Sequence, residues 1–131
     1  MQKTILVVDD DQDLREQMRI HLEAAGYRVD TADGVTTAHE YLAENNPDIA
    51  IVDLMLEHVD SGFSLCYYIK KRKPELPIIM VSAVMTETGF SFDAATEEER
   101  SWVRADVFLN KPVRTEQLLS EVERLLGQKD G

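Results

Sequence analysis

Three aspartates, Asp9, Asp10 and Asp53, each come at the end of a short run of aliphatic residues, and their carboxylates could do chemistry together. Residues 5–8 precede the first two aspartates, and residues 49–52 precede the third. Four aliphatic residues in a row are typical of a strand that is covered on both faces, as in a parallel sheet. Open parallel sheets bind ligands at the carboxyl ends of their strands. Two adjacent strands would therefore bring the three carboxylates to one place.

Such a carboxylate cluster has to be neutralised. At about 4 Å and an effective dielectric constant of about 20, each pair of like charges costs roughly 4 kcal/mol. The cluster therefore either takes up protons or binds a cation. Carboxylate oxygens are hard ligands, which favours Mg2+ or a similar ion. We expect a cation site that contains all three aspartates.

Two further polar residues end apolar runs and are expected at the same edge of the sheet. Ser82 ends the run that begins at residue 77, and Lys111 follows the run at 107–109. One carboxylate that attacks phosphorus and two that hold Mg2+ would make a phosphoryl-transfer site in which the protein supplies the acceptor. The hydroxyl and the ammonium group can each bind a phosphate oxygen.

The apolar pattern alternates between strands and helices along the whole chain. Strands are predicted at residues 4–8, 27–32, 49–53, 77–82 and 107–109. The second of these alternates polar and apolar residues, so we expect it at an edge of the sheet. The predicted helices include one from about residue 12 that stops at Gly26, one over 35–45, one from about 63 to 73, and a last one that stops at Gly127. Five β–α units in this order predict a doubly wound α/β sandwich.

Length, charge and cysteine content restrict the class of protein. The 131 residues fit one domain, expected over residues 1–127 with a short tail at 128–131. Cys66 is the single cysteine, which excludes an internal disulfide and suits the reducing cytoplasm. No apolar run approaches the roughly 18 residues that cross a bilayer, so no membrane partner is expected. The net charge of -11 argues against direct nucleic-acid binding.

Four segments resemble the receiver domain of two-component response regulators. They are ILVVDD at residues 5–10, IVDLML at 51–56, MVSA at 80–83 and FLNKPV at 108–113. The segments stand in the order of the family and cover essentially the whole chain. The resemblance implies a flavodoxin-like fold with a five-stranded parallel sheet in the order 2-1-3-4-5 between five helices.

The resemblance also implies the role of each acidic residue. Asp53 matches the phosphoacceptor, which takes its phosphoryl group from a sensor histidine kinase or a histidine phosphotransfer protein. Asp9 and Asp10 match the Mg2+-binding pair, and the backbone carbonyl of Met55 is expected to be a further ligand. The chain would then be a switch rather than an enzyme, because it would catalyse only its own phosphorylation and dephosphorylation.

The remaining matches concern the response to phosphorylation. Ser82 matches the hydroxyl that turns toward the phosphoryl group, Lys111 the lysine that contacts it, and Phe108 the aromatic that swings inward on activation. The implied outputs are a downstream protein partner, an output domain that this sequence does not contain, or a phosphorylation-dependent homodimer. The chain departs from the family in having Glu57 where a proline is usual, and in a lengthened segment at 86–96 that is expected to reshape the output face.

Other interpretations of the same residues stay open. Asp10 or Asp11 could cap a helix, and Phe108 could be an ordinary core residue. A small Mg2+-dependent phosphatase of the haloacid dehalogenase type also uses an aspartate nucleophile at a strand end. Its D-x-D motif could be Asp9 and Asp11, although Gln12 follows where threonine or valine is usual and the chain has no room for a cap. A third alternative is a degenerate module that binds partners without phosphorylation.

Overall fold

The computed structural model describes residues 2–53, 61–82, 106–110 and 113–130. Five parallel strands form one sheet in the order β2-β1-β3-β4-β5, which confirms the predicted order and places β2 at an edge. The strands are β1 (Thr4–Val8), β2 (Arg28–Ala32), β3 (Ile49–Asp53), β4 (Ile78–Ser82) and β5 (Val107–Asn110). The helices that lie in the described ranges are α1 (Gln12–Ala24), α2 (Val35–Glu44), α3 (Ser61–Arg72) and α6 (Thr115–Asp130).

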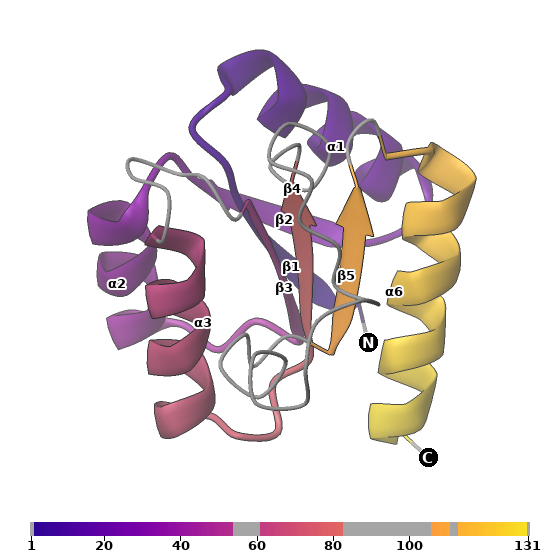
Figure 1. Cartoon of the computed structure of the whole chain (residues 1–131). Helices are drawn as coiled ribbons and strands as arrows, with labels where there is room; N and C mark the ends of the chain where they lie inside the picture. The colour runs from indigo at the N-terminus through magenta and orange to yellow at the C-terminus, as the bar shows by residue number, and fades with distance from the viewer. Residues whose placement is uncertain (1, 54–60, 83–105, 111–112, 131) are drawn as a thin grey trace.

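The sheet separates two apolar cores. Helices α2 and α3 cover one face, and α1 and α6 cover the other (Figure 1). Alternate residues of β1 show the division, because Leu6 and Val8 belong to the first core and Ile5 and Val7 to the second. A strand that packs on both faces has to be apolar at every position, which explains the unbroken aliphatic runs in the sequence.

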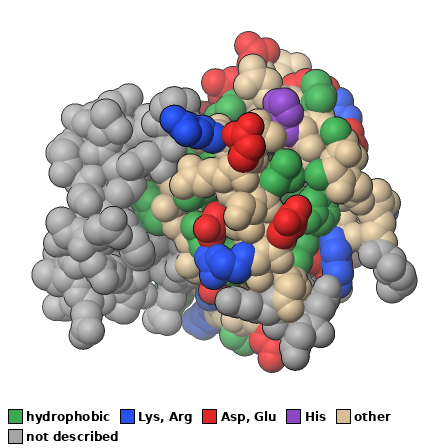
Figure 2. Space-filling model, turned by 90° about the vertical axis from the view of Figure 1, so that its right-hand side faces the viewer, with side chains coloured by type: hydrophobic (Ala, Val, Ile, Leu, Met, Phe, Trp, Pro, Cys, Tyr) green, Lys and Arg blue, Asp and Glu red, His purple; other side chains and the backbone are tan. Residues whose placement is uncertain are grey.

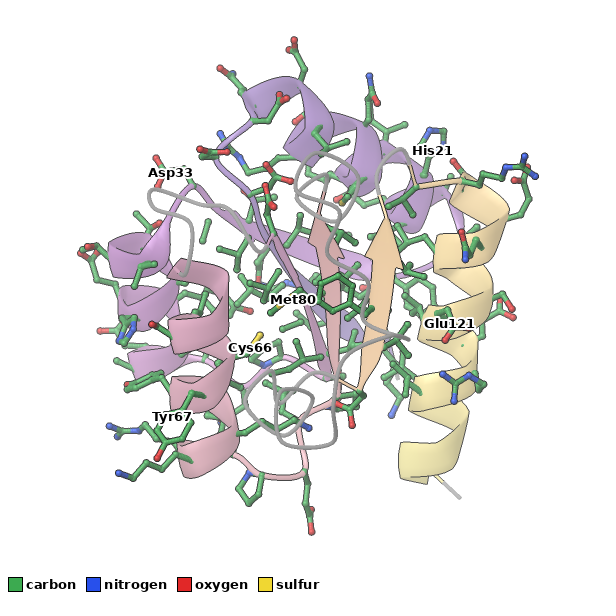
Figure 3. The ribbon with its side chains drawn as sticks, in the orientation of Figure 1. His21, Asp33, Cys66, Tyr67, Met80 and Glu121 are labelled. Carbon is green, nitrogen blue, oxygen red and sulfur yellow. The ribbon has the colours of Figure 1, made fainter. Side chains whose placement is uncertain are left out.

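Side chains of α3 illustrate how the first core is filled. Cys66 and Met80 of β4 both point into the space between α3 and the sheet, whereas Tyr67 points away from it (Figure 3). Cys66 is fully buried, and this burial raises the pKa of its thiol. The thiol therefore stays protonated and behaves as a small apolar group.

Two aspartates at the amino ends of strands tie neighbouring elements together. Asp48 comes directly before β3, and its Oδ2 accepts a hydrogen bond of 2.8 Å from the backbone N–H of Thr4. Asp106 comes directly before β5, and its Oδ2 accepts hydrogen bonds of 2.8 Å from the backbone N–H of Ile78 and from Nζ of Lys70. These bonds join β1 to β3, β4 to β5, and α3 to both β4 and β5.

On the side where α6 lies, the described residues form no surface region with charges of one sign only (Figure 2). Acidic and basic side chains are interspersed there among the described residues (Figure 2). No helix in the described part of the chain is both long enough and apolar enough to cross a membrane.

The two glycines that were predicted to stop helices behave differently. Gly26 follows α1 with a φ of 100°, in the left-handed region, and its N–H bonds to the carbonyl of Glu23. The prediction that the last helix stops at Gly127 is wrong, because α6 continues to Asp130. Gly127 does not have a positive φ, and a glycine ends a helix only when it leaves the helical conformation. Leu125 and Leu126 are buried and hold this last part of α6 against the second core.

Alanine substitutions at these glycines are expected to have effects of opposite sign. Gly26→Ala should lower the free energy of unfolding by about 1–2 kcal/mol, the cost of a left-handed conformation for an L-residue. Gly127→Ala should raise it by about 0.5–1 kcal/mol, because alanine is the better helix former. Nothing lies within 4 Å of a Cβ added at either position, so only the backbone conformation differs. Urea denaturation of both variants measures this, and effects of equal sign would contradict it.

Candidate functional site

The predicted carboxylate cluster is present at the carboxyl ends of the two central strands. β1 and β3 pair in parallel with Val8 opposite Val52, so the residues that follow these two valines lie side by side. Asp9, Asp10 and Asp53 each offer a ligand atom, and these atoms all lie within 4.8 Å of one another. Asp9 and Asp53 are buried, at 1% and 4% exposure, whereas Asp10 is exposed. The cluster is therefore a half-open site with two of its three carboxylates taken out of water.

Asp9 is held by hydrogen bonds at three of its atoms. Its backbone N–H donates to the carbonyl of Ala32 at 3.1 Å, which continues the ladder with β2. Its Oδ1 accepts from the backbone N–H of Asp11 at 2.9 Å. Its carbonyl oxygen accepts from Nη1 of Arg15 at 2.7 Å. The main chain and the carboxylate of Asp9 are therefore fixed before any ligand binds.

The neighbouring aspartates of the same stretch have structural functions instead. Asp11 is the N-cap of α1, and its Oδ1 accepts a hydrogen bond from the backbone N–H of Leu14 at 3.2 Å. Asp13 lies in the first turn of α1, where a negative charge complements the helix dipole. The capping alternative thus applies to Asp11, while Asp10 belongs to the cluster.

The donor set suits a hard divalent cation. Three carboxylates at this separation repel one another, and burial of two of them strengthens the repulsion because little water is left to screen it. The hydrogen bond from the N–H of Asp11 fixes the orientation of the Asp9 carboxylate, whose oxygens lie with those of Asp10 and Asp53. All-oxygen coordination by carboxylates is the preference of Mg2+ and related ions. The residues present therefore fit the expected cation.

Comparison with known proteins decides the family. A family model described as the response regulator receiver domain matches residues 5–123. This chain belongs to the receiver domain family. Receiver domains are the signalling switches of two-component systems, and the assignment gives no support to the phosphatase alternative.

Individual relatives agree with this assignment. The receiver domain is 36% identical over 122 residues to the heme response regulator HssR of Staphylococcus haemolyticus, covering 92% of this chain and 50% of HssR. It is 36% identical over 126 residues to the transcriptional regulatory protein GltR of Pseudomonas aeruginosa, covering 95% of this chain and 49% of GltR. The chain thus spans about half the length of the curated relatives that it matches.

Solved structures show the same fold. A CheY-like receiver domain protein from Methanospirillum hungatei JF-1 superposes with a TM-score of 0.82 at 25% identity, with full coverage of both chains. NtrX from Brucella abortus superposes with a TM-score of 0.78 at 30% identity, covering 99% of this chain and 27% of NtrX.

Ser82 and Phe108 lie on the neighbouring strands β4 and β5. Ser82 ends β4, next to β3 and opposite Asn110 of β5, so its backbone reaches the edge where Asp53 lies. The side chain of Ser82 is outside the described part of the structure. Phe108 is half-buried and packs against the first core. This position accommodates both the switch role and the ordinary core role of Phe108.

Several predicted residues fall outside the described residues. These are Lys111, Met55, Glu57 and the segment at 86–96. Their roles remain predictions. Arg15, by contrast, contacts the site and was not found by sequence reasoning. The available signal was its place in the first turn of the helix that follows the acidic stretch.

The asparagine variant of Asp10 tests the charge balance of the cluster. Asp10→Asn should raise the metal-free stability by an amount on the order of 1 kcal/mol, because one repelling charge is removed from an exposed position beside two buried carboxylates. It should also reduce the stabilisation by Mg2+, which is roughly 2.7 kcal/mol at a concentration of 100 times the dissociation constant. Thermal unfolding with EDTA and with Mg2+ measures both effects. Asp13→Asn, outside the cluster, is the matched control and should keep the wild-type response to Mg2+.

Proposed function

We propose that this receiver domain is a phosphorylation-driven switch with Asp53 as its phosphoacceptor. The observation that carries the proposal is the convergence of Asp9, Asp10 and Asp53 at the carboxyl ends of β1 and β3. Asp53 is buried in the last position of its strand, and the other two carboxylates flank it. A single acceptor with two adjacent carboxylates fits metal-assisted phosphoryl transfer to the protein.

The reaction transfers a phosphoryl group from nitrogen to oxygen. A carboxylate oxygen of Asp53 attacks the phosphorus of a phosphohistidine on a sensor histidine kinase or a histidine phosphotransfer protein. The new P–O bond gives an acyl phosphate, and the P–N bond breaks with its electron pair returning to the imidazole. Asp9, Asp10, Asp53 and the backbone carbonyl of Met55 would hold the Mg2+. The ion, when bound, offsets the negative charge of the transferred oxygens.

The phosphorylated state is read through the rest of the domain. Ser82 and Lys111 each bind a phosphoryl oxygen, and Phe108 changes its packing against the first core. These local changes bias a two-state surface that a downstream partner, an output domain or a second phosphorylated copy recognises. The domain works in the cytoplasm and turns over no substrate other than its own phosphate.

Treatment with acetyl phosphate and Mg2+ tests the proposal. The wild-type chain should gain the mass of one phosphoryl group in intact-mass spectrometry, and Asp53→Asn should gain none, because it lacks the nucleophile. Chelation of Mg2+ with EDTA should prevent the modification of the wild type. Asp13→Asn, which changes an exposed aspartate of α1, should be modified like the wild type.

The same sample distinguishes the switch from a phosphatase. Incubation with p-nitrophenyl phosphate and Mg2+ should give no sustained release of nitrophenol, because a switch does not hydrolyse this substrate in repeated turnovers. Multiple turnovers per chain would contradict the proposal. Modification of Asp53→Asn to the wild-type extent would contradict the assignment of the acceptor.

A further inference from the structure

Arg15 lies beside the acidic cluster and bonds to its main chain. Its Nη1 donates a hydrogen bond of 2.7 Å to the backbone carbonyl of Asp9, in a partly buried setting. Within the part of the chain that the structure describes, this carbonyl is the group that Arg15 binds, and no carboxylate takes up its guanidinium. The carboxylates of the cluster are thus not neutralised by an ion pair with Arg15.

A second arginine of α1 shows the more usual arrangement. Arg19, one turn further along the helix, pairs with the carboxylates of Glu16 and Glu23. Such exposed pairs at a spacing of three or four residues add a few tenths of a kcal/mol to the helix. Arg15 and Arg19 therefore lie on the same helix but bind different groups. Arg19 binds carboxylates, whereas Arg15 binds a backbone carbonyl.

The bond from Arg15 closes a short ring between the cluster and α1. The backbone N–H of Arg15 donates to the carbonyl of Asp11 at 3.0 Å, which begins the helix, while its side chain reaches back to Asp9. Asp11 in turn caps α1 and donates its own N–H to Oδ1 of Asp9. Residues 9–11, which we call the acidic turn, are thereby anchored to the first turn of α1 at both ends.

We propose that Arg15 is a positioning residue for the cation site. By holding the carbonyl of Asp9 it sets the direction in which the acidic turn leaves β1, and with it the placement of Asp9 and Asp10 opposite Asp53. This inference rests on the proposed function, in which these carboxylates hold Mg2+. Groups that orient metal ligands from behind in this way commonly change metal affinity by about 10–100-fold when they are removed.

The positive charge of Arg15 and its positioning of the acidic turn should have opposite effects on the affinity for Mg2+. If Arg15 acted only as a nearby positive charge, it would repel the cation, and its removal would tighten Mg2+ binding. If it positions the acidic turn, its removal weakens binding. The sign of the change in the Mg2+ dissociation constant therefore separates the two roles.

The experiment compares Arg15→Met with Arg19→Met by isothermal titration with Mg2+ alone. We expect about tenfold weaker binding for Arg15→Met and wild-type binding for Arg19→Met, which removes an equal charge from the same helix. Arg15→Lys, which keeps a charged donor, should restore most of the affinity. Unchanged or tighter binding by Arg15→Met would overturn the inference.

Two further measurements keep the result interpretable. Metal-free thermal unfolding shows whether Arg15→Met is folded; if it is not, Arg15→Gln, a shorter neutral donor, takes its place and should also bind Mg2+ more weakly. If wild-type chain binds no Mg2+, the proposed function itself fails. Normal wild-type binding together with unchanged binding by the Arg15 variants would overturn only the role of Arg15.

Discussion

The parallel pairing of β1 with β3 is the constraint on which the rest of the structure depends. These two strands lie in the interior of the sheet, are hydrogen-bonded on both sides, and are covered by apolar cores on both faces. Asp9 and Asp53 therefore cannot relieve their mutual repulsion by moving apart, since any such movement would break the ladder and open the cores. The pairing of β1 with β3 thus keeps the three carboxylates together, and the same geometry that buries two of them makes the candidate site.

The two edges of the sheet use aspartates in contrasting ways. At the amino ends of the strands, Asp48 and Asp106 accept hydrogen bonds from backbone N–H groups of neighbouring strands. Their charge is used to hold the strands in register. At the carboxyl ends, Asp9, Asp10 and Asp53 face one another. Helix α1 begins at this second edge, so the capping residue Asp11 and the guanidinium of Arg15 meet the cluster there. The aspartates that hold the strands in register thus lie at the amino ends of the strands, and those of the candidate site lie at the carboxyl ends.

Element prediction succeeded where the signal was local. The strands were placed to within a residue because residues that pack on both faces have to be apolar throughout. The start of α3 was predicted near Phe63, whereas the helix begins at Ser61. The predicted end of α6 was wrong because a glycine permits a left-handed conformation without requiring it. Gly26 adopts that conformation and Gly127 continues the helix, although both looked alike as sequence signals.

The amino-acid sequence by itself determined that Asp9 and Asp53 lie together at one edge of the sheet. An aspartate at the end of a buried strand is visible in one dimension, and the order of strands brings such residues to one edge. Only the tertiary structure decided that Asp10 joins the cluster while Asp11 caps α1, and that Arg15 binds the carbonyl of Asp9. The physical reason is that burial follows the periodicity of the chain. A hydrogen bond depends instead on tenths of an ångström and on the angle at which a helix leaves a strand, and neither is encoded in residue type and spacing.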